Sequence, residues 1–100
     1  MARVAQLEME RRKIALLSLI VRTSGSTDGG AQFSRDELRA ELSFSETQLR
    51  TLVNRLRDAG YLAVDPCYLD NGGQAGNVYR ITPEGKEYFI NTVAMLRLAD

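Results

Sequence analysis

The stretch FSETQLRTLVNRLRDAGYL, which starts at Phe44, constrains the fold most, because it encodes both ends of one helix. Ser45 followed by Gln48 three residues later matches a capping box, and Phe44 with Leu49 matches a hydrophobic staple. Gly60 supplies the left-handed residue that commonly follows a helix. We therefore predict a helix that begins directly after the serine and ends just before the glycine.

Within this predicted helix, residues 46–59, apolar side chains recur at helical spacing and share one side: Leu49, Leu52, Val53 and Leu56. The opposite side carries hydroxyl, amide and guanidinium groups, which hydrogen-bond base edges and phosphates. The polar side and its flanks comprise Thr47, Gln48, Arg50, Thr51, Asn54, Arg55 and Asp58. The pattern indicates a DNA-recognition helix, and an ordinary solvated surface helix is the alternative.

The charge balance bears on this interpretation. The chain has 13 basic and 13 acidic residues, so its formal net charge is zero. Proteins that coat nucleic acid without specificity depend on neutralising phosphates, and a neutral chain argues against that class. A sequence-specific dimeric regulator can still be neutral overall if its basic groups gather on one face.

Other classes are excluded by what the sequence lacks. With no histidine and a single cysteine, Cys67, the chain has no Cys/His zinc set, no internal disulfide and no histidine base. No other constellation of nucleophile and base is recognisable, so we expect neither an enzyme nor a cofactor or metal site. The 100 residues predict one domain. The sequence shows no apolar run long enough for a membrane span and no leader pattern for export, so we expect a cytoplasmic protein.

The residues before the recognition helix predict two further helices. Residues 2–22 contain no glycine or proline and carry a helical apolar stripe from Ile14 onward. A glycine-rich loop and a brief strand near Phe33 follow. Ser34 with Glu37 forms a second capping box, and the short helix that it opens gives residues 34–59 the spacing of a helix-turn-helix.

The residues after it predict a hairpin and a last helix. Residues 61–81 read as a wing: a strand broken at Pro66, a flexible tip, and a second strand in which Val78 and Arg80 face one way and Tyr79 and Ile81 the other. Residues 83–99 read as the last helix, with a proline in its first position.

Both terminal helices carry apolar residues beyond the needs of a small core. In residues 1–13, Val4 and Leu7 are spaced like the edge of a two-helix seam, and a solvated turn is the alternative. In the last helix, Phe89, Val93 and Leu96 extend an apolar face that is too long for one small core. This surplus predicts a homodimer.

Two segments carry a resemblance to known regulators. SETQLRTLVNRLRDAGYL resembles the recognition helix and following strand of MarR-like and PadR-like bacterial regulators, and VYRITPEGKEYF resembles their second wing strand and next helix. The resemblance implies an α+β, mainly helical winged helix-turn-helix with three helices, a two- or three-stranded wing and a C-terminal helix. It implies a dimer that sets residues 46–59 in the major groove of double-stranded DNA. The implied base or phosphate contacts are Ser45, Thr47, Gln48, Arg50, Thr51 and Asn54, with wing roles for residues 71–77.

The wing tip departs from the family pattern. Family wings often carry arginine or lysine there, whereas DNGGQAGN has neither. Asn71, Gln74 and Asn77 remain candidates for contacts to sugar or phosphate. Our hypothesis is therefore a prokaryotic, phage or plasmid transcription regulator, and the rival is a winged-helix module that binds protein without DNA. The sequence defines no effector and no operator.

Overall fold

The computed structural model describes the backbone of residues 2–25, 30–68 and 70–99. Within these ranges, the side chains of residues 2–5, 74, 75, 98 and 99 lie outside the description. The predicted contacts of Val4 and Gln74 therefore fall on side chains that the structure does not describe. The elements are α1 (Ala2–Ser24), β1 (Gly30–Phe33), α2 (Arg35–Leu42), α3 (Glu46–Asp58), β2 (Leu62–Tyr68), β3 (Gln74–Ile81) and α4 (Pro83–Ala99).

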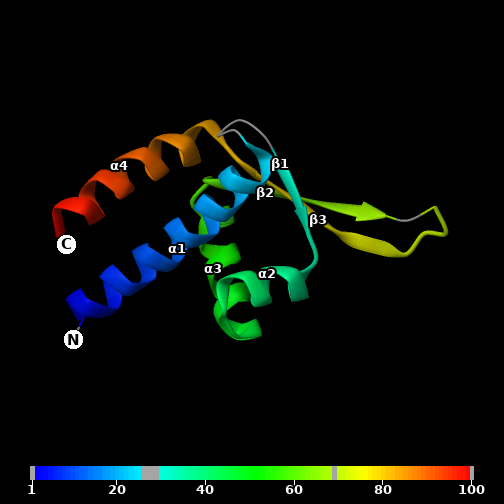
Figure 1. The fold of residues 1–100 in the computed structure, drawn as a ribbon, viewed down its shortest axis with the longest axis horizontal. Coiled ribbons are helices and arrows are strands. Elements are labelled where there is room, and N and C mark those ends of the chain that lie inside the picture. The colour runs from blue at the N-terminus through cyan, green and yellow to red at the C-terminus, as the bar shows by residue number, and fades with distance from the viewer. Residues whose placement is uncertain (1, 26–29, 69, 100) are drawn as a thin grey trace.

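The elements form an elongated molecule with extents of 48 × 27 × 22 Å. Helices α1 and α4 contact each other and project from one end, while the β2–β3 hairpin projects from the other (Figure 1). Helices α2 and α3 lie between these ends. The order of helices, hairpin and last helix confirms the predicted mainly helical winged helix-turn-helix fold.

One antiparallel sheet of three strands has the order β1-β3-β2. The central strand β3 alternates as predicted, because Tyr79 and Ile81 are buried while Arg80 is exposed and Val78 half-buried. The predicted break at Pro66 is wrong, since β2 continues through it with a register shift between Pro66 and Tyr68. An edge strand tolerates proline there because one side of its backbone needs no partner strand.

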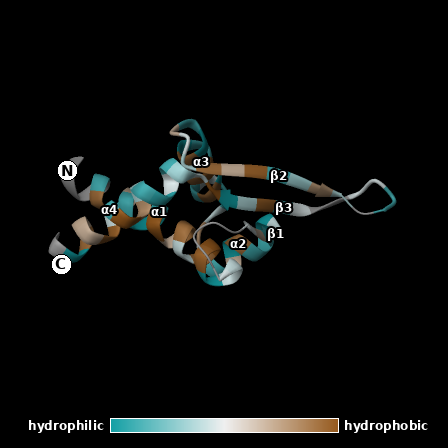
Figure 2. Ribbon diagram, turned by 90° about the horizontal axis from the view of Figure 1, so that it is seen from above, coloured by the Kyte–Doolittle hydropathy of each residue, from teal (hydrophilic) through white to brown (hydrophobic). Residues whose placement is uncertain are grey.

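The core lies where α1, α3 and the sheet meet. Its fully buried leucines and isoleucine come from three helices: Leu16, Leu17, Ile20, Leu38, Leu49, Leu52 and Leu56. The sheet adds Ala31, Phe33, Leu62, Tyr79 and Ile81. Figure 2 shows apolar and polar residues interspersed along the helices and along β2. Helix α3 is therefore held by its apolar side, with its polar side left outward.

Both helices of the helix-turn-helix begin with the predicted capping boxes. In α2 the Glu37 amide donates to Ser34 Oγ at 3.1 Å, and the Ser34 amide donates to Glu37 Oε1 at 3.0 Å. The turn between the helices contains Ser43 in the left-handed region, with φ of 57°. Because only glycine enters that region without strain, the turn holds Ser43 in an unfavourable backbone conformation.

Candidate nucleic-acid interface

The polar side of α3 stands free of the core, as the sequence predicts. The apolar stripe is buried, with exposed fractions of 1% at Leu49 and 0% at Leu56. The predicted DNA contacts on the helix are exposed except Thr51, which is half-buried: Thr47, Gln48, Arg50, Thr51, Asn54 and Arg55. No hydrogen bond from the described core uses these groups, so most of this side is available to an external partner.

The first turn of α3 is already hydrogen-bonded. The Gln48 amide donates to Ser45 Oγ at 3.1 Å, and the Ser45 amide donates to Gln48 Oε1 at 3.0 Å. A base contact by either side chain would compete with this capping box, whose loss costs about 1 kcal/mol. Arg50 forms an exposed ion pair with Glu46 at 3.5 Å, and such pairs are weak enough to exchange for a phosphate.

A groove of about 380 Å³ runs between α3 and the hairpin. Its floor is apolar, formed by Leu49 and Val53 of the helix and by Val64, Pro66 and Tyr79 of the hairpin. Its polar groups come from α2, α3 and β3: Arg35, Asn54, Arg57 and Asn77. Asn54 and Asn77 are the only two predicted contacts that the described groove brings together.

The sequence-based prediction missed Arg57 as a member of this groove. Arg50, Asn54 and Arg57 fall at i, i+4 and i+7, so they form one stripe along the helix. That spacing was the available signal. Which stripe faces the hairpin depends on how the chain folds back after Gly60, and local spacing does not encode that.

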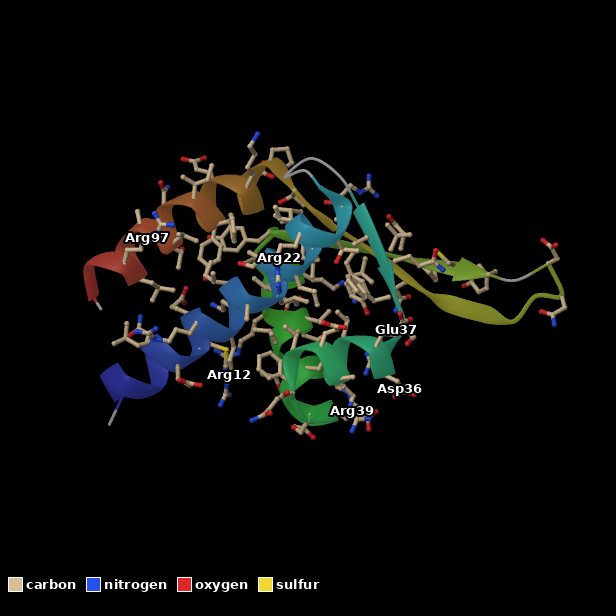
Figure 3. All side chains as sticks on the ribbon, viewed as in Figure 1. Arg12, Arg22, Asp36, Glu37, Arg39 and Arg97 are labelled. Atoms are coloured by element: carbon tan, nitrogen blue, oxygen red, sulfur yellow. The ribbon has the colours of Figure 1, made fainter. Side chains whose placement is uncertain are left out.

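Arg35, at the start of α2, lines the same groove as Asn54 and Arg57 of α3. It lines both the main groove and a smaller hollow against Ser34, Gly76 and Asn77. Within the part of the chain that the structure describes, Arg35 and Arg57 have no ion-pair partner. By contrast, the neighbouring Arg39 pairs with Asp36 at 3.6 Å, and Figure 3 shows both at the exposed side of α2.

The other half of the predicted polar face turns toward α1. Thr47, Gln48 and Thr51 line a hollow of about 170 Å³ together with Met9 and Arg12 of α1. The predicted contacts thus separate into a set beside the wing and a set beside α1. Asn54 belongs to the first set and Thr51 to the second.

The hairpin residues that the structure shows lining the groove include no lysine or arginine. Asn71 accepts a hydrogen bond from the Gly73 amide at 2.9 Å and so shapes the tip, while Asn77 Nδ2 donates to the Tyr79 hydroxyl at 3.3 Å. Arg80 pairs with Asp65 at 2.6 Å. Since side chains alternate along a strand, this pair lies on the face opposite Asn77 and Tyr79.

The predicted dimer contacts have different surroundings. Leu7, Phe89 and Val93 are half-buried, whereas Leu96 is only 8% exposed because it is packed within its own chain. Ile90 and Met95, at 55% and 46% exposed, offer more apolar surface, and the predicted interface lacked Ile90. No helix in the described ranges is long and apolar enough to span a bilayer.

The fold is similar to that of several solved structures. One is a PadR-like transcription factor from Bacteroides fragilis, with a TM-score of 0.72 and 14% identity, and the match covers 99% of this chain and 92% of that one. A Thermoplasma acidophilum protein described as a transcriptional regulator has a TM-score of 0.67 at 15% identity, covering 94% and 87%. The circadian clock associated protein Pex from Anabaena has a TM-score of 0.61 at 16% identity, and the match covers 91% of this chain and 78% of that one.

These identities are low, so the three structures establish the fold. A search of curated proteins found no match. The sequence model of the winged helix DNA-binding domain matches residues 16–98, which include the whole helix-turn-helix, the wing and most of the last helix. The protein therefore belongs to the winged helix DNA-binding domain family.

Proposed function

We propose that the protein is a cytoplasmic, sequence-specific transcription regulator without enzymatic activity, and that it binds double-stranded DNA as a homodimer. The observation that carries the proposal is the groove between α3 and the wing. An exposed helix edge bearing Arg50, Asn54 and Arg57 stands beside a hairpin, and family membership supports DNA as the partner of such an arrangement.

In this proposal α3 enters the major groove. Asn54 reads a base edge, since an amide side chain matches the donor and acceptor pair of adenine. Arg50, released from Glu46, reaches a base or a phosphate. Arg35 and Arg57, which both line the α3–wing groove, neutralise backbone phosphates and fix the orientation of the helix.

The apolar surface of the terminal helices supports the homodimer. Ile90 and Val93 fall at i and i+3 along one side of α4, and Val93 lines a groove of about 320 Å³ together with Ile14 and Ala15 of α1. Two copies joined there would present two α3 helices to one face of DNA. Dimers of this kind bind half-sites roughly 34 Å apart.

The test is binding of the full chain to genomic DNA fragments over a range of salt concentrations. Recovered fragments should share a two-fold repeated motif, and the logarithm of the binding constant should fall linearly with the logarithm of salt concentration. Binding without any preferred sequence would refute specificity. No binding to any fragment at low salt would refute DNA as the partner.

A second candidate function is a winged-helix module that binds a protein. It is favoured by the neutral net charge and by a tip, residues 70–77, that contains no lysine or arginine. The same assay separates the two functions, because a protein-binding module would show no salt-dependent retention of DNA.

A further inference from the structure

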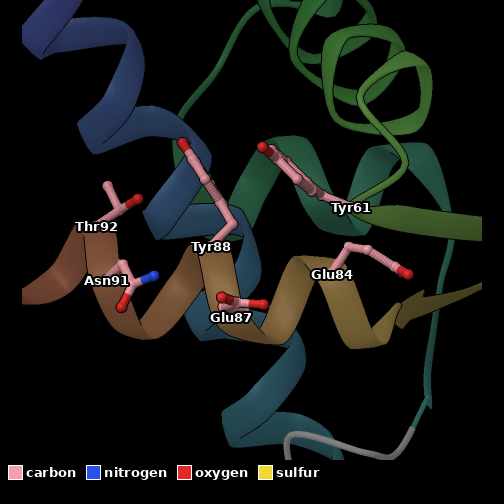
Figure 4. Close-up of a pocket in the computed structure, with 6 residues that line it drawn as sticks. All are labelled: Tyr61, Glu84, Glu87, Tyr88, Asn91 and Thr92. Carbon is pink, nitrogen blue, oxygen red and sulfur yellow. The ribbon is translucent and has the colours of Figure 1, made fainter.

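A second hollow shares no lining residue with the α3–wing groove. It measures about 320 Å³ and opens between α4 and Tyr61, which lies in the short connection from α3 to β2 (Figure 4). Its lining consists of Tyr61, Glu84, Glu87, Tyr88, Asn91 and Thr92, none of which lines the α3–wing groove. Nothing in the proposed DNA contact uses these side chains.

Two stacked tyrosine rings form the aromatic wall of the hollow. The rings of Tyr61 and Tyr88 lie 4.3 Å apart at 13°, and both side chains are half-buried. The Tyr88 hydroxyl donates a hydrogen bond to Glu10 of α1, which fixes the orientation of its ring. Aromatic rings attract cations through the negative charge on their faces.

The Tyr88 ring already has a cation of the same chain beside it. The Lys13 ammonium lies 5.9 Å from the centre of the Tyr88 ring. Lys13 also forms an ion pair with Glu10 at 3.2 Å, so its charge is balanced from within α1. The positive charge of Lys13 therefore does not neutralise the negative groups on the α4 side of the hollow.

Those negative groups are Glu84 and Glu87, which lie one turn apart on α4 with exposed side chains. Among the described residues, neither carboxylate has an ion-pair partner. The positive end of the helix dipole accounts for an acidic residue in the first turn, where Glu84 lies. It does not account for Glu87 beyond that turn, nor for two aromatic rings beside the pair.

The aromatic wall is held in place before any ligand arrives. The Tyr61 amide donates to the Leu56 carbonyl at 2.9 Å, and the Thr82 amide donates to the Tyr61 carbonyl at 3.2 Å. Gly85 lies so close to that carbonyl that an added β-carbon would come within 2.0 Å of the oxygen. A preformed wall reduces the entropy lost on binding.

We propose that this hollow binds a small organic cation. The ammonium group would lie between the carboxylates of Glu84 and Glu87, and the apolar or aromatic body would lie against the ring of Tyr61. The volume is at the lower end of small-molecule sites, which are roughly 300–1,000 Å³.

The test uses benzyltrimethylammonium as the probe and backbone amide NMR of the full chain as the readout. Benzyl alcohol and benzoate serve as neutral and anionic comparators of similar size. The proposal expects saturable shifts at Tyr61, Glu84, Tyr88 and Asn91 with the cation, and affinity for it at least about tenfold above that for either comparator. Equal affinity for all three, or shifts elsewhere, would overturn it.

A pair of charge-neutralising variants sharpens the test. Glu84→Gln with Glu87→Gln changes two exposed carboxylates and should weaken cation binding at least about tenfold while the melting temperature stays nearly constant. Glu41→Gln with Asp58→Asn makes the same change of charge at exposed sites outside the hollow, and should leave binding within about twofold. Unchanged binding in the first variant would overturn the proposal.

Tyr61→Phe separates the ring from its hydroxyl. It keeps the aromatic face and should bind the cation about as well as the unmodified chain. Tyr61→Leu removes the ring and should lose most of the affinity, with its fold checked by the amide spectrum. Equal binding by the leucine and phenylalanine variants would show that the ring does not hold the ligand, and would also overturn the proposal.

Discussion

Neighbouring side chains on α3 do different things. Leu56 has no exposed surface and holds the helix to the core, whereas Asn54 and Arg57 are exposed and line the groove beside the wing. Successive residues on a helix are about 100° apart, so stability and DNA contact are assigned to different residues within one turn. Substitutions on the exposed stripe should therefore change binding without unfolding the chain.

Arg57→Ala tests the assignment of a phosphate contact. We expect weaker binding to all DNA sequences and a salt dependence whose slope falls in magnitude by about 1, because one neutralised phosphate is lost. Fluorescence anisotropy at several salt concentrations measures both. Arg22→Ala removes the same charge from an exposed position in the last turn of α1 and should leave the slope unchanged. Equal slopes for all three proteins would refute the contact.

Tyr88→Phe tests the environment of the half-buried phenol. Burial, followed by the hydrogen bond to the Glu10 carboxylate, raises the pKa of Tyr88 above its usual value. In the unfolded chain the phenol loses its proton near pH 10, while the folded chain keeps it. The stabilisation from the neutral hydroxyl is therefore complete below about pH 10 and is lost as pH rises toward the folded pKa.

Urea unfolding between about pH 8 and 11 measures this effect. The unmodified chain should lose more stability over that range than Tyr88→Phe. Tyr68→Phe, at a residue that is 66% exposed on the wing, should lose as much as the unmodified chain. Parallel pH profiles for Tyr88→Phe and the unmodified chain would contradict the prediction.

Among the elements, α3 was the most predictable and the wing the least. The start of α3 is encoded by Ser45 and Gln48, its end by Gly60, and its buried stripe by the leucine spacing. The observed helix ends at Asp58, one residue before the predicted end. The division of its polar side was not predictable, because the wing and α1 approach it from distant parts of the chain. For the same reason Arg57 was missed while Asn54 was included.

The turn between α2 and α3 stores strain at Ser43. A residue with a β-carbon pays a free-energy cost in the left-handed region, and glycine does not. We expect Ser43→Gly to be more stable than Ser43→Ala by about 0.5–1 kcal/mol, since both remove the hydroxyl. Chemical denaturation of the two variants measures the difference. Equal stability would indicate that the turn relaxes in solution.

For the molecule as a whole, the sequence predicted the fold class and the order of elements but not the distribution of exposed apolar surface. The predicted dimer residues included Leu96, which is buried within its own chain, and omitted the exposed Ile90. Periodicity shows which residues share a helix face. It does not show how much of that face the same chain already covers.

Ile90→Glu tests the dimer. A charge in an apolar interface cannot be solvated, so we expect the sedimentation coefficient at micromolar concentration to fall from that of a dimer to that of a monomer. Ala40→Glu adds the same charge at an exposed position of α2 and should remain dimeric. A monomeric unmodified chain would refute the homodimer itself.

The bonds around Tyr61 couple α3 to α4. The Gly60 carbonyl accepts from the Thr82 hydroxyl at 2.5 Å, the Tyr61 carbonyl accepts from the Thr82 amide, and Gly85 leaves no room between the two segments. Helices α3 and α4 should consequently rotate together as one rigid body. In a homodimer joined through α4, the angle at which the subunits cross would then set the centre-to-centre distance of the paired recognition helices, and a change of a few degrees there would alter which operator spacings fit.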